Sequence, residues 1–274
     1  MALGPLSDLL ELRFQPPRVV RWLLGLGSVL LVLLVWWFIT RGEEPELRIV
    51  SPVTLPSPGE VWDQAASLFT ERQLLQSVAA TLQRVFLGFG LAILVGVPFG
   101  VLAGSWRGIE AFLAPISLFG RNIPIAALIP LTLFWFGAGE EQKVMFIFIA
   151  CVPFVFGNAV QAILDVESQY VETALTLGAS RLQIVLKVLV PLALPSIYNG
   201  LRILFGLAFG YIMLAEVIDA KHGLGHLINA SQKRGLTEHI YLILLLIGLT
   251  AYTIDRILWW FQRGLFPHTI RERE

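Results

Sequence analysis

Residues Glu172–Pro191 read ETALTLGASRLQIVLKVLVP, a stretch of mixed polarity that lies between long apolar runs. Its apolar residues form two short helical patterns, and Gly178 stands between them, where a left-handed or flexible corner would end the first helix. We expect Glu172 to lie in the first turn of the first helix and Ser180 to cap the second. Pro191 is expected to end the segment, because proline removes a backbone hydrogen bond. The stretch predicts a helix–turn–helix that lies across a membrane face and suits docking into a groove on another protein.

The composition indicates a helical membrane protein. Of 274 residues, 56% are hydrophobic and 15% are charged, and the mean hydropathy is +0.73. Several apolar runs approach the roughly 20 residues that a helix needs to cross a bilayer, whereas the short alternating segments of a closed barrel are absent. Twenty basic and 20 acidic residues balance, so nothing points to a nucleic-acid partner. The single cysteine, Cys151, lies in an apolar run and is expected to be a packing residue.

The apolar runs predict one all-α domain of six transmembrane helices within residues 22–261. The third run is interrupted by Arg121, Asn122 and three prolines, so we expect a broken or kinked span there. An amphipathic helix after Leu55–Pro58 is expected on the membrane surface. Glycines at four-residue spacing in the second and fifth runs predict close helix packing. The expected spans are 22–40, 85–104, 111–136, 143–164, 196–218 and 240–261, with residues 1–21, the loop 165–191 and residues 262–274 outside them.

The usual signatures of catalysis are missing from the sequence. It has no phosphate-binding loop, no H-E-x-x-H pair, no G-x-S-x-G elbow and no Cys/His cluster, so we expect neither an ATP site, nor a metal site, nor an enzyme. His222 and His226 are four residues apart, but Gly223 and Gly225 argue against a helix there. We expect both histidines to be solvated loop residues, since a third ligand is lacking.

Polar groups inside the apolar runs are candidates for the solute path, because they are costly in a membrane. Arg121 and Asn122 would offer positive charge and freed backbone amides to a passing anion. The alternative is that Arg121 satisfies loosened carbonyls or reaches a lipid phosphate. Glu216 is expected near the outer mouth of a path, and an ordinary interfacial position stays open for it.

The spacing of the opening stretch resembles the EAA loop of ABC-importer permeases. Glu172-Thr173-Ala174, three residues, Gly178, nine residues, and then Val188, one residue and Val190-Pro191 match the family pattern, with Thr173, Val188 and Val190 replacing Ala, Ile and Leu. In that family the loop is the cytoplasmic coupling helix that seats in a cleft of the ATP-hydrolysing subunit. The resemblance implies this role for Glu172, Thr173, Ala174, Leu177, Gly178, Ala179 and Arg181.

Further matches extend the resemblance over nearly the whole chain after residue 50. Ile123-Pro124, Trp135–Glu140, Leu194-Pro195 and Gly223–Gly225 are similar to permeases of the nitrate, sulfonate, taurine and bicarbonate branch. This implies a type I importer in the bacterial inner membrane, with both termini cytoplasmic. It also implies two permease copies, two ATP-binding subunits that hold ATP and Mg, and an external solute-binding protein.

The solute itself is less constrained by these matches. The branch favours a small anion, and a thiamine-precursor pyrimidine or riboflavin is the alternative. An autonomous secondary transporter or channel is a further alternative, although the sequence shows no inverted repeat and no carboxylate cluster within its spans.

Overall fold

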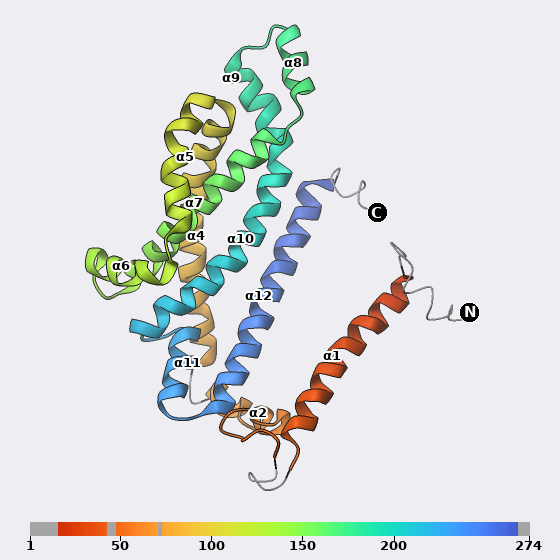
Figure 1. The fold of residues 1–274 in the computed structure, drawn as a ribbon, viewed down its shortest axis with the longest axis vertical. Helices are drawn as coiled ribbons and strands as arrows, with labels where there is room; N and C mark the ends of the chain where they lie inside the picture. The colour runs from red at the N-terminus through yellow and green to blue at the C-terminus, as the bar shows by residue number, and fades with distance from the viewer. Residues whose placement is uncertain (1–15, 43–47, 71–72, 268–274) are drawn as a thin grey trace.

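The computed structural model describes residues 16–42, 48–70 and 73–267, and every regular element in those ranges is a helix (Figure 1). The elements are α1 (Arg18–Thr40), α2 (Pro58–Asp63), α3 (Ala65–Thr70), α4 (Leu74–Ser105), α5 (Arg107–Asn122), η3 (Ile125–Ala127), α6 (Leu128–Phe136), α7 (Glu140–Leu164), α8 (Ser168–Thr176), α9 (Arg181–Ile184), η4 (Val185–Leu189), α10 (Val190–Asp219), α11 (Leu224–Lys233) and α12 (Thr237–Leu265).

Five helical runs in the described part of the chain are long and apolar enough to cross a membrane: 19–40, 74–105, 140–164, 181–218 and 237–265. The pair formed by α5 with η3–α6 makes a sixth if it is counted as one span, and it is bent by 90°. This confirms the predicted break in the third run. Because Ile123 precedes Pro124, the helical conformation is disfavoured at Ile123, and the backbone there is extended (φ −68°, ψ 127°).

The centre of the fold is the packing of α4 against α7. A Cβ added at Gly100 would lie 2.6 Å from the Cβ of Ala159 and 2.7 Å from the Phe156 carbonyl oxygen. Gly96 and Gly104 are approached as closely by α7, so the prediction of glycine-mediated packing is confirmed for the second span. Since a side chain at these positions would collide with α7, the glycines set the distance between the two helices.

The glycines of the fifth span make no such close contact with another helix of the described chain. No atom of the described chain lies within 4 Å of a Cβ added at Gly206 or Gly210, so their packing is not made within this chain. The helix α4 also begins eleven residues before the predicted span. Its first turns carry Ser77, Thr81 and Arg84, which are polar in the sequence but buried in the fold.

The opening stretch does not end at Pro191, which corrects the prediction. Residues Arg181–Ile218 form one helical run of 38 residues, with the π-helical turn Val185–Leu189 just before the proline. In a regular α-helix the proline ring would clash with the carbonyl of Lys187. The wider π turn relieves that crowding, so the chain passes directly from α9 into α10.

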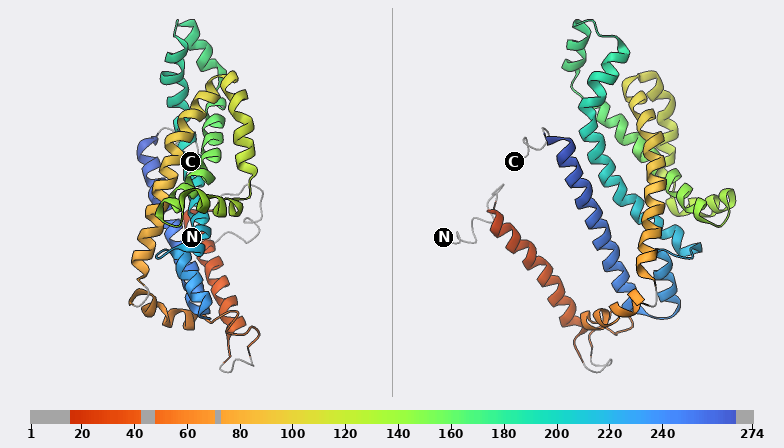
Figure 2. Two further views of the ribbon diagram at one scale, coloured as in Figure 1. Left: turned by 90° about the vertical axis from the view of Figure 1, so that its left-hand side faces the viewer. Right: turned by 180° about the vertical axis from the view of Figure 1, so that it is seen from behind.

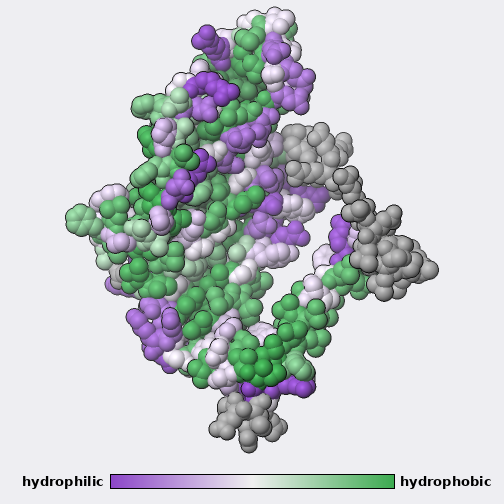
Figure 3. All heavy atoms as spheres, in the orientation of Figure 1, coloured by the Kyte–Doolittle hydropathy of each residue, from purple (hydrophilic) through white to green (hydrophobic). Residues whose placement is uncertain are grey.

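The first helix stands apart from the others in Figure 1 and in the reverse view of Figure 2. It is tied down near its end, where the Trp36 indole N–H donates to the Pro56 carbonyl at 2.9 Å and the ring lies 6.4 Å from that of Tyr241. The helix predicted after Leu55–Pro58 is present as two short pieces, α2 and α3, which bury Val61 and Leu68. Hydrophobic residues cover much of the middle of the molecule in Figure 3, and hydrophilic ones gather around α8 and α9.

Candidate functional site

The segment α8–α9 projects from one end of the helices, opposite α11 (Figure 1). The turn between α8 and α9 is a Schellman motif: Ala179 N–H donates to the Ala174 carbonyl at 3.0 Å, and Gly178 N–H donates to the Leu175 carbonyl at 2.9 Å. Gly178 has φ +77°, a conformation that side chains disfavour. The predicted left-handed corner at Gly178 is therefore confirmed.

The second half of the segment begins with a capping box. Gln183 N–H donates to the Ser180 hydroxyl, and the Gln183 side-chain oxygen accepts from Ser180 N–H at 2.8 Å, as the sequence predicted for Ser180. The position of Glu172 differs from the prediction. Because α8 begins at Ser168, Glu172 lies in its second turn, with an exposed side chain.

The inner face of the segment is anchored to the membrane helices. Ala174, Ile184 and Val185 are buried in one apolar cluster with Ala162 and Ile163 of α7. This explains the small residue at position 174, since its side chain packs under α8, whereas Glu172 and Thr173 face outward. The α8–α9 segment is therefore a fixed projection of the fold.

The outer face of the same segment carries unpaired apolar side chains. Leu177, at the corner, is 81% exposed, and Leu182 and Leu186 are also exposed. Ala179 is half-buried, and Arg181 in the first turn of α9 is exposed. Exposed apolar side chains that cluster on a rigid projection mark a contact with another protein or with the membrane. All seven predicted coupling residues lie on this projection.

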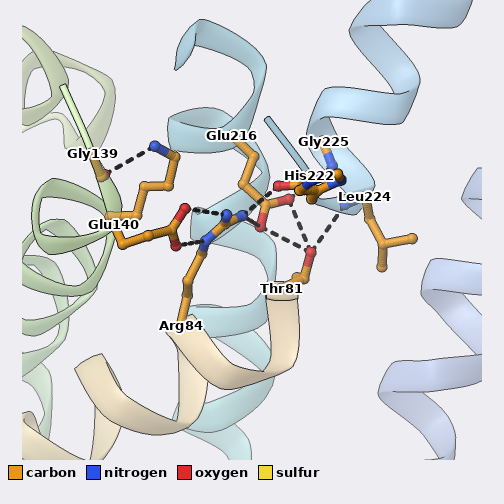
Figure 4. Close-up of polar contacts among 9 residues, drawn as sticks. Thr81, Arg84, Gly139, Glu140, Glu216, His222, Leu224 and Gly225 are labelled. Carbon is orange, nitrogen blue, oxygen red and sulfur yellow. Dashed lines mark hydrogen bonds and ion pairs between the residues drawn. The ribbon is translucent and has the colours of Figure 1, made fainter. Parts of the chain in front are cut away.

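A second polar site lies at the opposite end, among α4, α7, α10 and α11 (Figure 4). Arg84 donates from Nη1 to Glu216 Oε1 at 2.6 Å, and from Nε and Nη2 to both oxygens of Glu140 at 2.6 and 2.7 Å. Thr81 donates to both oxygens of Glu216, at 2.9 and 3.0 Å. Arg84 and Glu216 are 3% and 0% exposed, so this is a buried ion pair with its hydrogen bonds satisfied.

The same site holds the start of α11. Gly225 N–H donates to Glu216 Oε2 at 2.9 Å, and Leu224 N–H donates to the Thr81 hydroxyl at 3.0 Å. These amides belong to the first turn of a helix, where N–H groups lack helical partners and favour a negative charge. A Cβ at Gly223 would overlap the Glu216 carboxylate, so the backbone closes around this group only because position 223 is glycine.

The environment of Glu216 differs from the one that was predicted. From the sequence, Glu216 was expected near the outer mouth of a path, but its carboxylate is enclosed and accepts hydrogen bonds from Arg84, Thr81 and Gly225. Arg84 and Glu140 were not among the predicted site residues. The available signal was a charged residue, Arg84, directly before one apolar run, together with a carboxylate, Glu216, near the end of another.

Arg121 and Asn122 lie together at the end of α5, and both are exposed. The Asn122 amide donates to the Leu118 carbonyl at 2.8 Å, which satisfies part of the helix end. The Arg121 guanidinium lies over Gly157 of α7, where a Cβ would be 2.9 Å from Nη1. The charge of Arg121 therefore stays accessible at the bend between α5 and α6.

The position of His226 also differs from the prediction, since it lies on α11 and not in a loop. Gly223 and Gly225 do not prevent this helix, because Glu216 and Thr81 hold its first N–H groups. His222 lies before the helix, and Arg84 donates to its carbonyl at 2.7 Å. Within the described residues no group of three or more His, Cys, Asp or Glu side chains is placed to hold a metal ion.

Known proteins resemble the chain over most of its length. It is 31% identical to the taurine transport system permease protein TauC of Escherichia coli, with 94% of each chain covered. It is 29% identical to the bicarbonate transport system permease protein CmpB of Synechococcus elongatus, over 92% of this chain and 94% of that one.

Solved structures give the same result for the fold. A chain of the MetNI methionine ABC transporter, in an inward-facing conformation, matches with a TM-score of 0.64 and 25% identity, over 70% of this chain and 95% of that one. A chain of a bacterial ABC transporter that imports alginate matches with a TM-score of 0.58 at 17% identity, over 89% of this chain. The fold is that of a type I ABC importer permease.

A family profile described as the binding-protein-dependent transport system inner membrane component matches residues 96–271, more than half of the chain. Members of this family are transport subunits, and ATP hydrolysis takes place in separate ATP-binding subunits that work with a substrate-binding protein. The chain therefore belongs to this family and is an inner-membrane permease subunit of an ABC importer.

Proposed function

We propose that this permease imports a small anion by alternating access, and that α8–α9 is the projection through which partner ATPases drive it. The observation that carries the coupling role is the rigid projection with exposed leucines on its outer face, built on the Gly178 corner. The relatives named for taurine and bicarbonate transport support an anionic solute, with nitrate and sulfonates in the same class.

The helical run 181–218 gives this proposal a mechanical basis. It connects the projection at one end to Glu216 at the other without an intervening loop. At about 1.5 Å per residue, 38 residues span on the order of 55 Å, which exceeds the thickness of a bilayer. When ATP binding closes the partner dimer, the two projections move together, and each long helix transmits that movement to the outer end of the permease.

The remaining parts of the proposal concern assembly. Two copies of the chain line the path, surrounded by lipid, and Arg121 with Asn122 meets the solute at the bend after α5. Glu216 stabilises the outer end of this path by holding its helices together. ATP and Mg bind in the partner subunits, and this chain binds no cofactor. The projection faces the cytoplasm, as do residues 1–21 and 262–274, which flank the single membrane domain 22–261.

The coupling role is tested by recovering the partner ATPase with Leu177→Glu and wild-type permease as bait in detergent. Leu177 is exposed, so its replacement leaves the core intact, and a charge there opposes burial in a cleft. Ile49→Glu is the matched control, since Ile49 is 70% exposed but lies in the loop before α2. We expect Leu177→Glu to lose the ATPase and Ile49→Glu to keep it. Equal recovery with both variants, each with a wild-type unfolding transition, would refute this role for the projection.

A further inference from the structure

A polar pocket of about 200 Å³ lies between the start of α4, the loop before α11, and α11 itself. Its polar lining carries four basic or imidazole side chains and two buried hydroxyls: Lys221, His222, His226, Arg234, Ser77 and Ser231. The two serines are 1% and 6% exposed, so the base of the pocket is well enclosed. Lys221 and Arg234 are exposed at its rim.

The charged side chains that line this pocket are of one sign. None of the described residues that line it carries a carboxylate. The nearby carboxylates, Glu140 and Glu216, are both bound by Arg84, whose single charge offsets one of them, and Lys143 adds a second positive charge near Glu140. Ser77 lies in the first turn of α4, where backbone N–H groups and the helix dipole add positive potential. Burial, followed by electrostatic repulsion from His222, Lys233 and Arg84, lowers the pKa of His226.

We propose that this pocket binds an oxyanion group, a carboxylate or a sulfonate. Basic side chains pair with such groups, and the serine hydroxyls supply the additional hydrogen bonds that hold them in place. A volume of about 200 Å³ is several times what a single bound water needs, which suits a headgroup of a few atoms. The placement of the pocket on the outer side of the membrane rests on the proposed function, since it lies at the end opposite α8–α9.

The pocket is connected to the buried ion pair. The His222 side chain lines the pocket, while its backbone carbonyl accepts from Arg84 Nη1 at 2.7 Å. Through Arg84, the loop that carries Lys221 and His222 is tied to Glu216 near the end of α10. An anion in the pocket therefore contacts the loop that carries Lys221 and His222, and Arg84 links this loop to the outer end of α10.

Two sources supply this chemistry: the free solute, or an acidic side chain of the docked solute-binding protein. These two sources are distinguished by NMR spectroscopy of the complete transporter in a neutral detergent, in which the ring signals of His226 are followed. Methanesulfonate and acetate are titrated first, with uncharged dimethyl sulfone as the control. Solute-free binding protein is added in a second series.

A saturable response of His226 to methanesulfonate or acetate, and none to dimethyl sulfone, would establish the pocket as a site for the free anion. A response to the binding protein alone would assign it to a protein carboxylate. A lack of response to either probe would overturn the proposal. The titration reads anion binding at His226, whereas the ATPase recovery reads the contact made by α8–α9, so failure of one proposal is distinguishable from failure of the other.

Two variants test the location of the anion site. In Lys221→Gln/Arg234→Gln, the loss of two exposed cations should weaken the response on the order of fivefold. Lys233→Gln removes one positive charge, next to Arg234 but at a position that does not line the pocket, and it should retain most of the affinity. If the anion response were weakened equally in both variants, the effect would come from general surface charge, which would contradict a defined site.

Discussion

Arg84 and Glu216 lie 132 positions apart in the chain, yet Nη1 of the arginine lies 2.6 Å from Oε1 of the glutamate inside the fold. The pair joins α4 to α10 and, through the amides of Leu224 and Gly225, to α11. A buried ion pair contributes little compared with well-packed apolar residues, but the loss of one partner leaves an uncompensated charge. Its main consequence is therefore a fixed arrangement of three helices.

Arg84→Met should destabilise the protein strongly, by about 3 to 5 kcal/mol, because it leaves Glu216 charged and buried. Glu140→Gln should cost about 1 kcal/mol or less, since the Glu140 side chain is 66% exposed and reaches water when its bonds to Arg84 weaken. The unfolding midpoint in detergent measures both. The assigned roles would be wrong if Glu140→Gln were the more damaging change.

The packing of α4 against α7 predicts a contrast between two glycines of one helix. Gly100→Ala should destabilise by about 1 to 3 kcal/mol, because the new methyl group collides with Ala159 and with the Phe156 carbonyl. At Gly90 no atom lies within 4 Å, so Gly90→Ala should be neutral or stabilise by a few tenths to about 1 kcal/mol. Thermal unfolding of both variants side by side tests the contrast, which similar midpoints would contradict.

Gly178→Ala should impair coupling more than folding. Alanine at φ +77° costs about 1 to 2 kcal/mol, and the turn relieves this strain by reorienting α8 relative to α9. Gly90→Ala is the control, because Gly90 is helical and has no neighbour within 4 Å in the described chain. We expect solute-stimulated ATPase activity of the reconstituted complex to fall several-fold for Gly178→Ala alone. Full activity of a folded Gly178→Ala complex would contradict the requirement for this corner.

Anion binding in the pocket by α11 should tighten as the pH falls. Burial, followed by the charges of His222, Lys233 and Arg84, holds the pKa of His226 below its usual value, so this ring is largely neutral at pH 7. A bound anion stabilises the protonated ring and raises that pKa, so binding takes up a proton. Affinity should therefore rise as the pH falls from 8 through the titration of His226, by at most about tenfold for each unit by which the pKa rises.

The control for this pH dependence is His226→Gln, which keeps a polar side chain but does not titrate in this range. Isothermal titration with methanesulfonate between pH 5.5 and 8 should give a flatter profile for this variant. A profile identical to that of the wild type would assign the dependence to another group. The charged or titratable groups around His226 are Lys221, His222, Lys233 and Arg234, together with Arg84 and its partners Glu140 and Glu216.

Arg121→Gln should reduce transport of an anion more than transport of a neutral analogue. The guanidinium is exposed at the end of α5 and lies over Gly157, so its charge is available at the bend. The comparison is uptake of a sulfonate and of its uncharged sulfone by the reconstituted complex. Equal losses for both solutes would assign Arg121 a structural role at the helix break.

Local chemistry explains why much of the coupling projection was predictable. Gly178 and Ser180 act through backbone conformation and capping, which depend on residues no more than five positions away. The ends of the helices were harder to predict from the sequence. The sequence places the end of the opening stretch at Pro191 and the start of the second span at Val85, because proline and polar residues read as breaks. In the fold, a π turn accommodates the proline, and Arg84 extends the helix by pairing with distant carboxylates.

By itself the sequence determined the membrane character, the break before Pro124 and the corner at Gly178, because hydropathy and backbone preferences act over short distances. Only the tertiary structure decided that Glu216 is enclosed and that Lys221, His226 and Arg234 surround one pocket. The physical reason is that a buried charge is tolerated only where partners from other helices converge on it. That convergence depends on how α4, α7, α10 and α11 pack in space.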